Sequence, residues 1–68
     1  MNTYVLQQRF GSTGKWFDEY VYREDEYDLA LRRLEVEWNW RGRKLARLVR
    51  RHWVYGKTES LEIVREWQ

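Results

Sequence analysis

The residues best equipped to do chemistry lie in one basic segment, RGRKLARLVRRHWVYGK, at positions 41–57. It holds seven of the thirteen Lys and Arg residues, the single histidine and no acidic residue, a net charge of +7. Guanidinium groups bind phosphates and carboxylates through paired hydrogen bonds, and neighbouring rings stack on bases or bury against a protein. We therefore predict a binding patch made of Arg41, Arg43, Lys44, Arg47, Arg50, Arg51, Trp53, Tyr55 and Lys57, with Trp40 as an additional contact.

The segments on either side of this patch are acidic. Residues 1–40 carry five Lys/Arg and eight Asp/Glu, and residues 58–68 carry one Arg and three Glu, so the whole chain is only +2. Two kinds of partner fit such a patch: an acidic protein surface, or nucleic acid. A protein partner is favoured because acidic flanks would oppose the approach of DNA. Self-association as a homodimer, with acidic and basic segments of two copies in contact, is one form of this.

Catalytic and metal-binding patterns are missing from the sequence. The chain has no cysteine and one histidine, and its glycines at 11, 14, 42 and 56 do not form a phosphate-binding loop. Ser12 and Ser60 lack the context of a nucleophile. We therefore predict no catalytic residue, no metal site, no cofactor and no small-molecule substrate, and interpret the protein as a non-enzyme. His52 is expected to serve packing or hydrogen bonding.

Length and pattern predict a single small domain, 1–68. The runs TYVLQQRF and KWFDEYVYR are rich in β-formers and flank the loop GSTG, which indicates a β-hairpin. Residues 24–40 change to a helical period, with Asp25 as a plausible N-cap and Gly42 as the terminator. The apolar stripe of this amphipathic helix consists of Tyr27, Ala30, Leu31, Leu34 and Trp38.

The basic segment itself fits two structures. A second helix at 43–54 gives the cleaner apolar stripe, whereas a strand at 44–54 gives the run LEIVREW a neighbour with which to form a hairpin. We favour the strand, in which the arginines of 47–51 would face Glu62 and Glu66 across the ladder. The predicted fold is α+β: a small antiparallel sheet of two hairpins with one helix packed on one face, in the order ββαββ.

This order of elements, with the strings DLALRRL, RLVRR and EIVRE, resembles the small cysteine-free accessory proteins of bacteriophages and prophages. The resemblance implies an accessory or inhibitor protein that binds a host protein, in the cytoplasm of a bacterial host. No stretch approaches the about 20 apolar residues of a membrane span, and MNTYVLQQRF lacks the features of a signal peptide. We therefore expect a cytoplasmic protein without a membrane partner.

Overall fold

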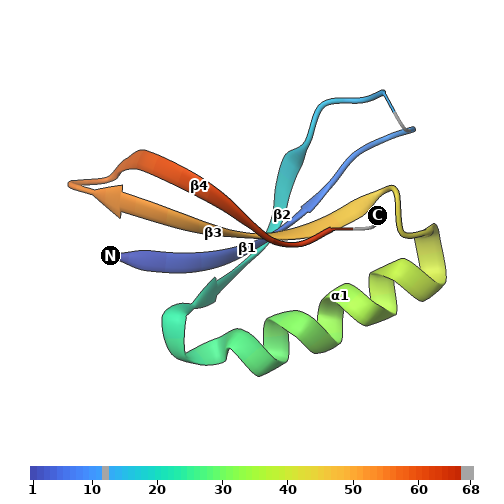
Figure 1. Ribbon diagram of the computed structural model, residues 1–68, viewed down its shortest axis with the longest axis horizontal. Coiled ribbons are helices and arrows are strands. Elements are labelled where there is room, and N and C mark those ends of the chain that lie inside the picture. The colour runs from blue at the N-terminus through green and yellow to red at the C-terminus, as the bar shows by residue number, and fades with distance from the viewer. Residues whose placement is uncertain (12, 67–68) are drawn as a thin grey trace.

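The computed structural model describes residues 1–11 and 13–66. Strands β1 (Asn2–Gln8) and β2 (Phe17–Arg23) are followed by a 3-10 turn, η1 (Glu24–Glu26), and helix α1 (Tyr27–Arg41). Strands β3 (Ala46–Val54) and β4 (Lys57–Arg65) complete one antiparallel sheet of order β2-β1-β3-β4. Figure 1 shows the helix along one side of a strongly twisted sheet, with the two hairpins spreading apart. The predicted α+β fold of order ββαββ is confirmed.

The alternative second helix at 43–54 is wrong, because this segment forms β3. Its periodicity suits a helix, but β3 pairs along its length with β1 on one side and β4 on the other. Two hydrogen-bonded ladders outweigh the modest preference of the isolated segment for a helix. The expected contact between the two strands is present in part, since Arg50 lies opposite Glu62 and forms an ion pair with it. Arg51 instead lies opposite Leu61 and is ion-paired with Asp18, because alternation along β3 sends its side chain to the other face.

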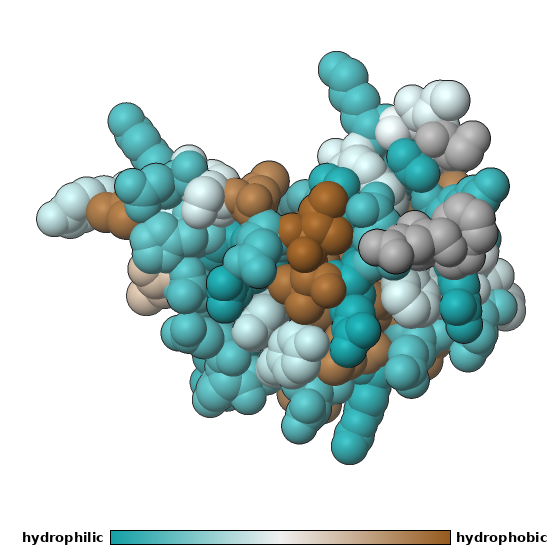
Figure 2. All heavy atoms as spheres, in the orientation of Figure 1, coloured by the Kyte–Doolittle hydropathy of each residue, from teal (hydrophilic) through white to brown (hydrophobic). Residues whose placement is uncertain are grey.

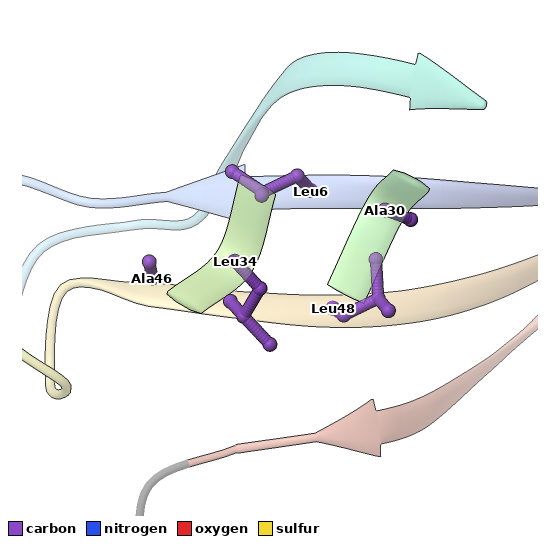
Figure 3. Close-up of a cluster of buried hydrophobic side chains, with 5 residues drawn as sticks. All are labelled: Leu6, Ala30, Leu34, Ala46 and Leu48. Carbon is purple, nitrogen blue, oxygen red and sulfur yellow. The ribbon is translucent and has the colours of Figure 1, made fainter. Parts of the chain in front are cut away.

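The core lies between α1 and the central strands. It consists of buried residues from β1, α1 and β3, shown in Figure 3: Leu6, Ala30, Leu34, Ala46 and Leu48. The rest of the predicted helical stripe packs against this cluster, so the stripe is confirmed in full. The indole N–H of Trp38 also donates to the carbonyl oxygen of Ala46 at 2.9 Å, which fixes the end of the helix to the start of β3.

The ends of the helix are set by local hydrogen bonds. Asp25 is not the N-cap: residues 24–26 form the 3-10 turn, and the Arg23 backbone N–H donates to the Glu26 carboxylate at 2.8 Å. Gly42 ends the helix as predicted, with its N–H donating to the carbonyl oxygen of Trp38 at 3.1 Å. Its φ of 107° lies in a region that glycine adopts readily.

Candidate functional site

The structure separates the predicted patch into four places. Successive side chains of a strand point to opposite faces, so β3 sends Arg47, Arg51 and Trp53 to one face of the sheet and Arg50 to the other. Arg43 and Lys44 lie in the connection between α1 and β3, with Arg41 at the end of α1, whereas Tyr55 and Lys57 lie at the tip of the β3–β4 hairpin. A continuous basic segment in the sequence is therefore not one continuous surface.

One of these places is the face of the sheet opposite α1, where side chains from all four strands form one surface. We call it the helix-free face. Its central row crosses all four strands, because Val21 pairs with Val5, Val5 with Val49 and Val49 with Ile63. The two middle valines are fully buried, although no element of residues 1–11 and 13–66 packs over them. The outer members remain open, Val21 with 56% and Ile63 with 50% of its surface exposed.

Arginine-bearing rows flank this apolar row on both sides. One row is formed by Asp18, Gln7 and Arg47, and the other by Arg23, Thr3, Arg51 and Leu61. Figure 2 shows hydrophobic side chains gathered where β4 crosses the centre of the view, with hydrophilic side chains around them. Within these rows Arg51 is ion-paired with Asp18, and Arg23 with Asp25 and Glu26. The helix-free face therefore combines an apolar strip with one arginine, Arg47, that forms no ion pair with a described residue, and arginine beside apolar surface is common in protein-binding surfaces.

Hydrogen bonds hold the polar side chains of this face in place. Arg51 Nη1 donates to Asp18 Oδ2 at 2.8 Å, and Gln7 Nε2 donates to the other oxygen of the same carboxylate at 3.0 Å. Gln7 Oε1 in turn accepts from Arg47 Nε at 2.8 Å. The chain of contacts joins the two arginine rows across β1 and β2, so hydrogen bonds within the chain orient both guanidinium groups.

Arg47 keeps its charge available. It contacts a neutral amide and the Trp16 ring, whose centroid lies 4.3 Å from Cζ, and forms no ion pair with a described residue. Partial burial lowers the pKa of Arg47 from its ordinary value, Glu66 opposes that shift, and Arg9 adds to it. An arginine remains protonated after such a shift, so the face carries a fixed positive charge at this point.

Two residues that the sequence interpretation assigned only to the hairpin join this site. Arg9 lies over the Trp16 ring at 4.4 Å from the centroid, and its Nε donates to the carbonyl oxygen of Lys44 at 2.9 Å. A hollow of about 220 Å³ beside them is lined by Arg9, Trp16, Arg43, Lys44 and Glu66. The predicted hairpin could have indicated the contact between Arg9 and Trp16, because its closure brings the end of β1 next to the residue that precedes β2.

The opposite face of β3 is largely neutralised within the chain. Arg50 forms an ion pair with Glu62, and this hydrogen bond is the main cause that raises the pKa of Arg50. His52 lies 2.6 Å from the Asn2 side-chain oxygen through Nδ1 and 3.2 Å from Glu59 through Nε2. His52 therefore has the hydrogen-bonding role that was expected of it.

The remaining patch residues lie near the end of the helix and at the hairpin tip. Arg41 lies 3.3 Å from the buried Glu37 carboxylate, and Arg43 lies over the Trp38 ring at 5.3 Å. Trp40 is 83% exposed, on the same side of the sheet as α1. Tyr55 is almost wholly exposed, with a positive φ of 52° in the tight turn that it forms with Gly56.

Comparison of the chain with models of protein families, with curated proteins and with solved structures gives no match. Within the described ranges, no group of three or more His, Asp or Glu side chains is arranged to hold a metal ion. No helix within the described part of the chain is long and apolar enough to cross a membrane.

Proposed function

We propose that this domain is a non-enzymatic binding protein that docks its helix-free face against an acidic surface of a protein partner. The observation that carries the proposal is the apolar row from Val21 to Ile63, which is open at both ends and lies between two arginine-bearing rows. A partner would cover the exposed ends of this row, and the gain would come from removing apolar surface from water. Arg47, which forms no ion pair with a described residue, would select an acidic partner and orient it.

Preorganisation supports this choice of face over the other places that hold patch residues. Arg47 and Arg51 are tied through Gln7 and Asp18 into one network, so little side-chain freedom remains to be lost on binding. Arg50, on the opposite face, is paired with Glu62, and Arg51 is paired with Asp18, so Arg47 is the arginine of β3 that forms no ion pair with a described residue. The resemblance to phage accessory proteins adds the biological form of the proposal, an accessory or inhibitor protein that occupies a surface of a bacterial host protein.

The experiment is a pull-down from a bacterial lysate with the immobilised wild-type domain and two charge-reversal variants. Arg47→Glu changes the helix-free face, and Arg32→Glu makes the same change of charge on the exposed side of α1, where Arg32 forms no ion pair with a described residue. We expect a protein captured by the wild type to be captured by Arg32→Glu and lost with Arg47→Glu. Equal capture by all three would contradict the proposal.

A second candidate function, nucleic-acid binding, is favoured by the hollow beside Trp16. Arg9, Arg43 and Lys44 line it together with one carboxylate, Glu66, and a cluster of cations of this kind suits a backbone phosphate. Gel shifts with random duplex and single-stranded DNA at two salt concentrations test this function. A shift at low salt that is lost in Arg43→Glu would support it, and the absence of any shift at low salt would exclude it.

A further inference from the structure

Strand β4 presents an open edge of the sheet. It is the outermost strand next to β3, and its backbone N–H and C=O groups on the far side have no strand to pair with among the described residues. Eight of its nine residues are exposed, including Leu61 at 53% and Ile63 at 50%. A long edge with exposed aliphatic side chains is a template for pairing with another strand.

The charges along β4 would complement those of a second, antiparallel copy of the same strand. Glu59 precedes the central residues and Arg65 follows them, and Arg65 forms no ion pair with any residue in the described ranges. Both side chains lie on the helix side of the sheet: Glu59 contacts His52 there, and Arg65 pairs with Leu48, a core residue. An antiparallel copy of the same strand would place an acid opposite a base at each end.

We propose that two copies of this chain pair through β4 to form a homodimer with one continuous antiparallel sheet. The twofold axis stands perpendicular to the sheet and passes midway between the two copies of Glu62. Such an axis keeps like faces on the same side, and this requires a residue, not the bond between two residues, to lie at the centre. The register centred on Glu62 pairs Leu61 with Ile63 of the second copy twice, and Glu59 with Arg65 of the second copy twice.

The registers centred on the two preceding residues are worse. Centring the axis on Leu61 would place Lys57 opposite Arg65 and Glu59 opposite Ile63, and centring it on Ser60 would place Lys57 opposite Ile63 and Glu59 opposite Leu61. Like charges that face each other across a ladder destabilise it, and a charge opposite an aliphatic side chain gains nothing. In the proposed register only the two central Glu62 side chains repeat a charge, and each is already paired with its own Arg50.

The other edge of the sheet is less suited to this role. In β2, Arg23 already lies 3.4 Å from both Asp25 and Glu26, so its charge is used within the chain. Tyr20 accepts a hydrogen bond from Arg33 of the helix at 2.7 Å, and this ties the strand to α1. The pairing of β1 with β2 is irregular at one place and that of β3 with β4 at two, so the preference for β4 rests on its charges and its exposed aliphatic side chains.

Sedimentation equilibrium of the wild type and of two charge variants tests the dimer. We expect the wild type to sediment at twice the 8.6 kDa of one chain at high protein concentration. Glu59→Arg alone and Arg65→Glu alone should each weaken the dimer about tenfold or more, because two opposite-charge pairs become two like-charge pairs. Mixing the two variants should restore a dimer, since every Glu–Arg pair is then re-formed between unlike chains.

The same substitution at two apolar residues, one on each edge of the sheet, supplies the matched control. Ile63 and Val21 end the same cross-strand row and are about equally exposed, one on each edge. Ile63→Lys should give a monomer, and Val21→Lys should remain a dimer while losing the partner that the helix-free face binds. This dimer does not depend on the proposed function. A wild-type monomer at the highest soluble concentration, or dimers that survive both charge variants, would overturn it.

Discussion

The two faces of the sheet are built from the same four strands but are closed in different ways. On one face, α1 seals Leu6 and Leu48 beneath Leu34, and partly buried aromatic side chains surround them. On the other, Val5 and Val49 are just as buried, without a helix above them. The helix-free face is therefore buried at the centre of its apolar row and exposed at both ends, at Val21 and Ile63. The first face is a core, and the second is the surface that we propose as the binding face.

Removing side-chain volume beneath the helix should have the largest effect on stability. Leu34 is 1% exposed and packs at the centre of the cluster between α1 and the sheet. Leu34→Ala should lower the free energy of unfolding by about 3 kcal/mol, through lost burial and the cavity left behind. Chemical denaturation followed by tryptophan fluorescence measures this, and a loss below about 1 kcal/mol would show that the helix does not close a core.

The same kind of change on the helix-free face should cost less. Val49→Ala removes two methyl groups from a fully buried site, a loss of about 2 kcal/mol from transfer and cavity terms together. The variant should also bind the partner less well, because the apolar row loses its middle. If Val49→Ala were as harmful as Leu34→Ala, the two faces would be equivalent cores and the comparison would fail.

A change on the outer side of the helix should have the smallest effect. Trp40 is 83% exposed on the side of α1, so Trp40→Ala should change the free energy of unfolding by no more than about 0.5 kcal/mol. Partner binding should also be unchanged, because Trp40 does not belong to the helix-free face. Reduced partner binding by this variant would move the site toward the helix.

Local pattern was enough to predict most of the fold. The spacing of Tyr27, Ala30, Leu31, Leu34 and Trp38 identified the buried side of the helix, and Gly42 marked its end. The state of residues 44–54 could not be settled in this way, since their apolar spacing fits a helix and the deciding contacts come from β1 and β4. Such contacts are tertiary and leave no mark on the period of the segment itself.

The candidate site was predicted by composition but not by arrangement. Counting charge selected residues 41–57, yet alternation along β3 places Arg47 and Arg50 on opposite faces. Arg9 and Trp16 were missed because they lie far from that segment in sequence and reach it only when the first hairpin pairs with β3. A surface that is assembled from several strands becomes visible only when their register is known.

The measurement that tests this account most directly compares two variants of one strand. Arg47→Gln and Arg50→Gln each remove one positive charge from β3, the first from the helix-free face and the second from the face that carries α1. The dissociation constant of each variant for the captured partner is compared with that of the wild type by titration. We predict that Arg47→Gln weakens binding about tenfold or more, as expected for an arginine beside the apolar centre of an interface, while Arg50→Gln has little effect. Equal weakening by both variants, or a larger effect of Arg50→Gln, would contradict the assignment of the helix-free face as the binding surface.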